Sequence, residues 1–314
     1  MKMKRFAIFP FLILLLLVGC KNKSRDALTD TMTSGVIKIA VDENFEPIIQ
    51  EEIEVFEALT PMAGIVPIYC SEVDAVNYLL KDSVRLAITT RELSSQEMES
   101  FHSRKFFPRS IKLAIDGIAL IVNNQNPDSL ISVSQLEKIL TGEITDWKEL
   151  YPASRLGKLQ LVFDNPNSST VRFAMDSICK GKPLYEELKA QKTNSEVINY
   201  VARTPGAIGV IGVNWLGNPR DTTNLSFNDR IRVMAVSRAK IAIPENSFKP
   251  YQAYLATGSY PLSRNVYILL NDPRGALPSG LTAFLTGARG QRIILKSGLV
   301  PATEPVRIVN VKDE

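Results

Sequence analysis

Residues 161–173, LVFDNPNSSTVRF, join an apolar run to an amphipathic run through a polar elbow. The apolar run stops at Asp164, and five small or turn-forming residues lead from Asn165 to Ser169 before the amphipathic residues begin near Thr170. This order predicts a strand, a tight loop and the first turn of a helix. A helix N-terminus offers unpaired N–H groups and a partial positive charge, to which short hydroxyl side chains add donors. The elbow is therefore a capped turn, a nucleophile site or an anion-binding loop.

Strand-like and helix-like segments alternate on both sides of this elbow. The predicted strands cover residues 36–41, 65–69, 85–89, 115–122, 159–163, 207–212 and 260–270. The predicted helices cover residues 47–59, 72–80, a segment that begins with a capping box of Ser94 and Glu97, and then 133–140, 170–178, 195–203 and 281–297. This alternation predicts an α/β fold with mostly parallel sheets.

The length of the chain favours two lobes. About 280 residues follow the N-terminal segment, more than one core comfortably organises. We assign residues 35–118 and 262–314 to lobe 1 and residues 119–261 to lobe 2, joined by two long crossover strands. Two α/β lobes joined in this way form a clam shell, with ligand between them at strand C-termini and helix N-termini.

The first 20 residues have the pattern of an export signal. Lys2, Lys4 and Arg5 precede about 13 mostly apolar residues, too few for a stable membrane span. The apolar run ends in LVGC at residues 17–20, which resembles the cleavage site of bacterial lipoproteins. We therefore expect residues 1–19 to be a signal peptide, Cys20 to carry a lipid, and residues 20–34 to be a flexible tether. The alternative is an ordinary secretory signal that happens to contain a cysteine.

Composition excludes two function classes. The chain has 37 Lys+Arg and 33 Asp+Glu, and loss of residues 1–19 leaves 34 against 33, so no basic surface for nucleic acid is predicted. Only one histidine is present, and apart from Cys20 the cysteines are Cys70 and Cys179, so neither a metal site nor another cofactor is expected. Those two cysteines are compatible with a disulfide, but buried free thiols are the preferred interpretation.

Five segments, in order, resemble the phosphate-binding proteins of bacterial ABC phosphate importers, which have the two-lobed periplasmic solute-binding fold. They are AIDGIALIVNNQNP at 114–127, VSQLEKILTGEITDWKEL at 133–150, RTPGAIGVIGVNWL at 203–216, YPLSRNVYI at 260–268 and FLTGARGQRIILKSGLVP at 284–301. The resemblance implies a type II-like clam shell that captures phosphate or a similar tetrahedral oxyanion and delivers it to ABC permease subunits. It implies a monomeric binding protein rather than an enzyme, held in the cell envelope by a lipid alone and facing the periplasm or the exterior.

By this resemblance, the elbow occupies the position of the family's Arg-x-x-x-Ser-Gly-Thr phosphate loop. Ser168 and Thr170 stand at the Ser and Thr positions, Ser169 replaces the glycine, and Asn167 precedes them. Asp164 stands where the family has arginine, so a carboxylate replaces a guanidinium. It is a possible acceptor for a proton from the ligand, and it could equally repel phosphate.

Two more elbows are expected to contribute ligand contacts from lobe 1. Asn44 and Phe45, in the acidic segment DENFEP, follow the first strand, and Thr89, Thr90 and Arg91 follow the third. We expect Arg91 to supply the missing positive charge, because a guanidinium fork matches a tetrahedral oxyanion. The alternative for Arg91 is a surface ion pair with Glu92 or Glu97. Solvated helix positions are expected for Arg172 and Arg203.

Two other functions stay open at this point. One is a cell-envelope sensor or scaffold of the same fold that has lost transport, which the altered elbows motivate. The other is a serine hydrolase with Ser168 or Ser169 as nucleophile, although it lacks G-x-S-x-G and would have to recruit His102 as base.

Overall fold

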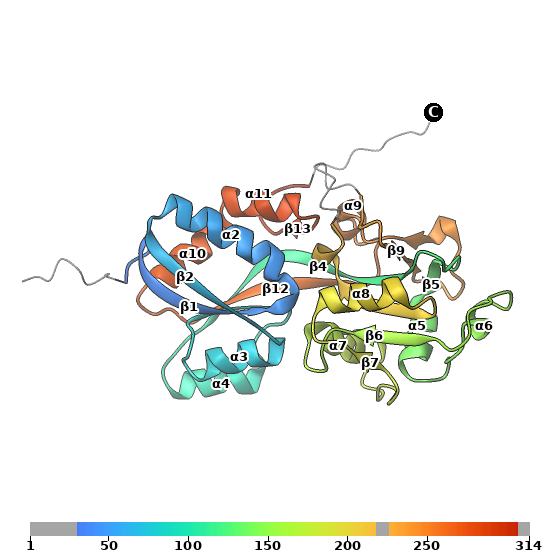
Figure 1. Cartoon of the computed structure of the whole chain (residues 1–314). Helices are drawn as coiled ribbons and strands as arrows, with labels where there is room; N and C mark the ends of the chain where they lie inside the picture. Colours follow the sequence, from blue (N-terminus) through green and yellow to red (C-terminus); the bar gives the residue numbers. More distant parts are fainter. Residues whose placement is uncertain (1–29, 218–225, 307–314) are drawn as a thin grey trace, which may run out of the picture.

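The computed structural model describes residues 30–217 and 226–306, which form two α/β lobes side by side (Figure 1). The predicted signal peptide, Cys20 and most of the predicted tether lie outside the described residues. The prediction of two α/β lobes is therefore confirmed for these described residues.

Lobe 1 is built on the strand order β2-β1-β3-β12-β4. These strands are β2 (Met62–Cys70), β1 (Ser34–Asp42), β3 (Leu86–Thr89), β12 (Ser263–Leu270) and β4 (Arg109–Asn123). The helices α2 (Glu46–Leu59), α10 (Leu277–Thr286) and α11 (Ala288–Lys296) lie on one side of this sheet, and α3 (Glu72–Leu80) and α4 (Ser95–Ser103) lie on the other (Figure 1). Apolar side chains of alternate strand positions pack under each helix layer, which is what a sheet buried on both faces requires.

Lobe 2 continues the same sheet from β4 through β8 (Ala207–Gly212) and β6 (Gln160–Phe163) to β7 (Lys189–Ala190). The helices around it are α5 (Val133–Leu140), α6 (Trp147–Leu150), α7 (Ser169–Phe173) and α8 (Asn194–Arg203). Smaller elements complete the lobe: β5 (Leu130–Ser132), β10 (Ala235–Ser237) and β11 (Ser247–Phe248) in a second sheet, with β9 (Ile231–Val233) and α9 (Gln252–Ala256). Near the C-terminus, β13 (Val300–Pro301) pairs with β4.

The two crossover strands introduce antiparallel pairing at the centre of the sheet. β4 and β12 run antiparallel beside each other, and β4 also pairs antiparallel with β8. Parallel pairs lie farther out, between β1 and its two neighbours and between β6 and its two neighbours. The sheet is thus mixed, because each crossover strand returns between lobes in the opposite direction. Since β4 takes part in both halves, the lobe boundaries near residues 118 and 262 stay a prediction.

The C-terminal helix differs from the prediction. Instead of one helix over residues 281–297, α10 ends and α11 begins at Gly287, whose extended backbone (φ −82°, ψ 168°) breaks the helix. The predicted helix over residues 170–178 is likewise α7 followed by a π-helical turn, Ala174–Ile178. No helix within residues 30–217 and 226–306 is long and apolar enough to cross a membrane. Cys70 and Cys179 are free thiols, and only Cys179 is fully buried.

Candidate functional site

The elbow after β6 is a capped helix start. The Ser168 hydroxyl accepts a hydrogen bond from the Val171 N–H at 3.3 Å, so Ser168 is the N-cap of α7. Its Oγ also lies 2.7 Å from Thr170 Oγ1, which donates to Asp164 Oδ1 at 2.6 Å. All these side chains except Val171 are essentially inaccessible to solvent. The elbow therefore presents hydroxyl groups and a carboxylate in a desolvated place, where each hydrogen bond is strong.

Asn44 brings the first elbow of lobe 1 onto this helix start. The Asn44 amide nitrogen donates to Asp164 Oδ2 at 3.3 Å and to Ser169 Oγ at 3.1 Å. Its amide oxygen accepts from Asn194 Nδ2, at the start of α8, at 3.2 Å. The side chain is held within its own elbow by a bond to Asp42 Oδ1 at 3.0 Å. Asn44 thus links the two lobes directly, at the ends of β1 and β6.

Arg264, on the crossover strand β12, supplies a buried positive charge to the cluster formed by Asn44, Asp164, Ser168, Ser169 and Thr170. Arg264 is 6% exposed, and its Nε donates to Asp116 Oδ2 on the other crossover strand at 2.8 Å. Its Nη1 donates to Ser169 Oγ at 2.8 Å, and its guanidinium carbon lies 5.6 Å from the centre of the Phe45 ring. Within the described ranges, Arg264 Nη2 is buried with no hydrogen-bond partner. A guanidinium nitrogen with a free donor is a natural partner for an oxyanion.

Sequence reasoning missed Arg264 and Asp116, although a signal was present. Both residues interrupt otherwise apolar strands, in IDGIALIV and YPLSRNVYILL. The two strands pair with Arg264 opposite Asp116, which makes an ion pair across their junction. A charged residue in each of two predicted buried strands indicates such a pair.

The third elbow contacts the cluster through Thr90 and not through Arg91. Thr90 donates from its N–H and its hydroxyl to Glu72 Oε1, at 2.6 and 2.7 Å. Arg172, on α7 of the other lobe, forms an ion pair with Glu72 and donates to Thr90 Oγ1 at 2.7 Å. Burial opposes ionisation of Glu72, but the bonds from Arg172 and Thr90 outweigh it and lower the pKa of this carboxyl. The expectation that Arg172 is a solvated helix residue is wrong.

Arg91 forms an ion pair with Glu97, which is the alternative that the sequence left open. Both terminal nitrogens of its guanidinium bind the Glu97 carboxylate, at 2.7 and 2.8 Å. The predicted capping box explains this, because Glu97 turns back to the N-cap Ser94 and so stands beside Arg91. Thr89 donates its hydroxyl to the Arg91 carbonyl at 2.8 Å. The structure therefore does not bring Arg91 into the cluster. Asn167 is an exposed residue of the turn that precedes α7.

Several polar atoms of the cluster are buried without a hydrogen-bond partner among the described residues. They are Asp42 Oδ2, Asp116 Oδ1, Asn194 Oδ1, Asn214 Oδ1 and Arg264 Nη2. Asn214 belongs to this cluster because its side-chain amide donates to the Asn44 carbonyl. Buried polar groups in folded proteins are almost always paired, so their concentration at one place is unusual. Spare donors and acceptors converging at a junction of two lobes indicate a ligand-binding site.

The described ranges contain neither the Ser–His arrangement that a serine hydrolase would need nor a cluster of metal ligands. His102 is exposed on α4 and packs against Phe107 with ring centres 5.1 Å apart. The hydroxyls of Ser168 and Ser169 are engaged by Thr170, Asn44 and Arg264, and within the described ranges neither hydroxyl is hydrogen-bonded to His102. Across residues 30–217 and 226–306, no group of three His, Cys, Asp or Glu side chains could hold a metal ion.

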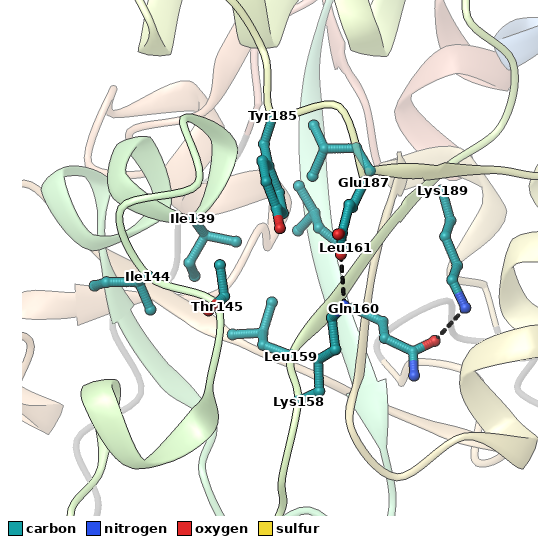
Figure 2. A pocket seen from close by; sticks show the side chains of 11 residues that line it. Ile139, Ile144, Thr145, Lys158, Leu159, Gln160, Leu161, Tyr185, Glu187 and Lys189 are labelled. Atoms are coloured by element: carbon teal, nitrogen blue, oxygen red, sulfur yellow. Dashed lines mark hydrogen bonds and ion pairs between the residues drawn. The ribbon is translucent and has the colours of Figure 1, made fainter.

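A separate hollow of about 190 Å³ lies at the outer edge of lobe 2 (Figure 2). It opens between α5, the start of β6 and the segment before β7, and none of the cluster residues lines it. Figure 2 shows the Lys158–Glu187 ion pair at this hollow, with the Tyr185 ring beside Glu187. The ring is placed by Gly142 (φ +80°), where a Cβ atom would lie 2.6 Å from it.

Known proteins match the chain along most of its length. A family model described as a PBP superfamily domain matches residues 27–288. The phosphate-binding protein PstS of Borreliella burgdorferi is 23% identical over 308 residues, which covers 95% of this chain and 99% of that protein. The phosphate-binding protein PstS of Bacillus subtilis is 22% identical over 289 residues, covering 90% of this chain and 86% of that protein.

Solved structures share the fold. A Clostridium perfringens protein, named as a phosphate ABC transporter substrate-binding protein and solved with bound phosphate, is 19% identical with a TM-score of 0.71. An ABC-type phosphate transport receptor from Vibrio cholerae is 21% identical with a TM-score of 0.65. Each comparison covers 85% of this chain and 100% of the other. Because the family model spans far more than half of its residues, the chain belongs to the PBP superfamily.

Proposed function

We propose that this protein captures inorganic phosphate, or a similar tetrahedral oxyanion, between its two lobes and delivers it to an ABC importer. The observation that carries the proposal is the buried junction where the Arg264 Nη2 donor has no hydrogen-bond partner among the described residues, while Nη1 of the same guanidinium binds Ser169 at the start of α7. Relatives that match nearly the whole chain are named as phosphate-binding proteins, which supports the same ligand class. Binding needs only hydrogen bonds and charge, so no enzymatic step is part of the proposal.

The proposed ligand contacts come from both lobes. Lobe 2 contributes the N-terminus of α7, and the elbows of lobe 1 contribute the remaining hydrogen-bonding groups. The residues we assign are Asn44, Phe45, Thr89, Thr90, Asn167, Ser168, Ser169, Thr170 and Arg264, with Asp164 as the acceptor for a proton carried by the ligand. We assign the main positive charge to Arg264 in place of Arg91, because Arg264 is buried beside Ser169 whereas Arg91 binds Glu97.

The location follows from the N-terminal pattern. We infer that the mature chain begins at Cys20, carries a lipid there, and works outside the cytoplasm next to its permease. The support is the LVGC sequence after a basic and apolar leader, together with relatives named as parts of phosphate transport. A single lipid chain holds a protein only weakly, so tight anchoring needs the diacylglycerol and acyl chains together.

The test is isothermal titration of the full chain with phosphate, sulfate and molybdate. Arg264→Gln should weaken phosphate binding by about 2–5 kcal/mol, since it removes a charged partner from a desolvated site. Arg91→Ala, the matched control, should leave the affinity within about twofold of the wild type, because Arg91 is bound to Glu97 and lies outside the cluster. Thermal melting of both variants separates lost binding from lost folding.

Two results would contradict the proposal in different ways. Failure of the wild type to bind any of the three oxyanions would favour the sensor or scaffold interpretation. A larger loss from Arg91→Ala than from Arg264→Gln would refute the assignment of Arg264 and restore the choice made from the sequence.

A further inference from the structure

Carboxyl groups outnumber the cations around the proposed site. Asp42, Asp116, Asp164 and Glu72 are buried and Glu43 is half-buried, whereas the cations that form ion pairs with this group among the described residues are Arg172 and Arg264. With all five carboxyls ionised, the two guanidinium groups leave a formal charge of −3. An oxyanion adds more negative charge in a place where water screens it poorly, so the ionised cluster would oppose binding.

Three of these carboxyls accept hydrogen bonds that favour their ionised form. Glu72 accepts bonds from Arg172 and Thr90, and Asp116 accepts from Arg264. Asp164 accepts from the Thr170 hydroxyl and, at 3.3 Å, from the Asn44 amide. Each of these oxygens has a donor that replaces the lost water.

Asp42 has an oxygen without a hydrogen-bond partner, as Asp116 does, but unlike Asp116 it forms no ion pair among the described residues. Its Oδ1 accepts from the N–H and the side-chain amide of Asn44, at 3.1 and 3.0 Å. Its Oδ2 is fully buried without a hydrogen-bond partner in the described part of the chain. The charge of Arg264 and the Ser169 hydroxyl favour the ionised form of Asp42, but the lost hydration outweighs them. A protonated Oδ2 would be a donor, and a donor is what an oxyanion requires.

Charged and titratable groups from every neighbouring element act on Asp42 and on the adjacent Glu43. Around Asp42 they are Arg264 of β12, Glu72 of α3 and Cys70 of β2; around Glu43 they are Asp164 after β6, Glu46 of α2 and Asp74 of α3. Burial is the largest effect on Asp42 and raises its pKa to about 6 even though Arg264 opposes the change. Burial, followed by the charges of Asp164 and Asp42, raises the pKa of Glu43 to about 7.

We propose that Asp42 determines specificity by binding the oxyanion as a protonated carboxylic acid, and that capture of the oxyanion draws one proton from solvent onto the Asp42–Glu43 pair. This inference rests on the proposed function, and it assigns Asp42 a role different from that of Asp164, which accepts a proton from the ligand. A neutral Asp42 donates through Oδ2–H to a ligand oxygen, so a repelling group becomes a binding one. No bond other than this O–H is formed or broken.

Proton uptake makes the affinity depend on pH in a defined direction. Above the range in which the pair titrates, each pH unit should weaken oxyanion binding by up to about tenfold, because one proton must be taken up with each ligand. Asp42→Asn keeps a donor at this position and has no proton to gain, so this part of the pH dependence should disappear. The variant should therefore bind phosphate more tightly than the wild type at pH 8.5.

The test is titration calorimetry of the full chain with phosphate, from pH 5.5 to 8.5, in pairs of buffers with different heats of ionisation. Phosphate exchanges its own proton in this range, but that contribution is common to every variant, so the difference between proteins isolates Asp42. The wild type should take up about one proton more than Asp42→Asn. Asp82→Asn, at a surface ion pair with Arg104, is the matched control and should behave as the wild type.

A second measurement does not depend on the folding of the variant. The infrared difference spectrum of the wild type at pH 7 should gain a protonated carboxyl band when phosphate is added, and absence of that band would overturn the inference. Equal proton uptake by the wild type and a folded Asp42→Asn, with phosphate binding intact, would overturn it as well. Absence of phosphate binding at every pH would instead overturn the proposed function, and this inference with it.

Discussion

Glu52 offers a direct test of how burial controls ionisation in this protein. It lies on α2 with both carboxyl oxygens buried and without a hydrogen-bond partner in the described residues. Its buried neighbours on the helix are Ile48, Ile49, Ile53 and Phe56. Burial, with a smaller contribution from the charge of Glu51, raises the pKa of Glu52 from 4.5 to about 9. The folded protein therefore holds a proton that the unfolded chain releases above pH 4.5.

The sign and size of the effect follow from this difference. The stabilising contribution of neutral Glu52 is complete below pH 4.5 and is lost progressively as the pH rises toward 9. One pH unit corresponds to about 1.4 kcal/mol, so this residue should lower the free energy of unfolding by about 2.7 kcal/mol between pH 6 and pH 8. Glu52→Gln has no proton to lose, so its free energy of unfolding should lack this decrease.

Urea denaturation of the wild type and the variant at pH 6, 7 and 8 measures the two slopes. The comparison uses slopes because a buried glutamine amide has a cost of its own at every pH. Glu54→Gln, on the exposed face of the same helix, is the control and should keep the wild-type slope. Equal slopes for the wild type and Glu52→Gln would show that Glu52 is hydrated or paired in the folded state, and the reasoning from burial would fail.

Three further predictions concern the anchor, the ligand and a tight turn. Cys20→Ser should release the protein from membranes or leave it unprocessed, and membrane fractionation identical to the wild type would refute lipidation. Asp164→Asn removes a proton acceptor, so the ratio of phosphate to sulfate affinity, measured by calorimetry, should fall about tenfold; an unchanged ratio would exclude Asp164 from that role. Gly142→Ala should destabilise the fold by about 2 kcal/mol, because alanine would have to adopt a left-handed backbone conformation and its Cβ would clash with the Tyr185 ring. Gly157→Ala, where nothing lies within 4 Å, should change the melting temperature much less, and equal losses would contradict the role of that contact.

Local signals were sufficient for most elements of this fold. The helices α3 and α5 and the strand β8 begin and end where the sequence pattern predicts, and the Ser94 capping box forms as expected. In each case the deciding interactions lie within a few residues, such as a cap, a turn or an alternation of apolar positions. The break between α10 and α11 was missed, although Gly287 lies inside the helix predicted over residues 281–297.

The site was less accessible to sequence reasoning because its partners are far apart in the chain. Arg264 and Asp116 are 148 residues apart, and their contact depends on the register between β12 and β4. Arg172 reaches Glu72 only because the lobes meet with α7 opposite α3. Arg91 shows the opposite case: its partner Glu97 is only six residues away, and this local ion pair, which the sequence left open as an alternative, holds the guanidinium outside the cluster.

The position of β12 within lobe 1 has a consequence for how the chain assembles. This strand lies between β3 and β4, although more than 130 residues separate it from β4 along the chain. Until β12 arrives, β3 and β4 each lack a neighbour, and the sheet of lobe 1 has a gap at its centre with two unpaired strand edges. Open edges of this kind pair readily with other molecules during folding. The strands β6, β7 and β8 of lobe 2 all precede β12 in the chain, so the sheet of lobe 1 should be completed last, and a chain truncated before β12 should aggregate rather than yield a half-sized receptor.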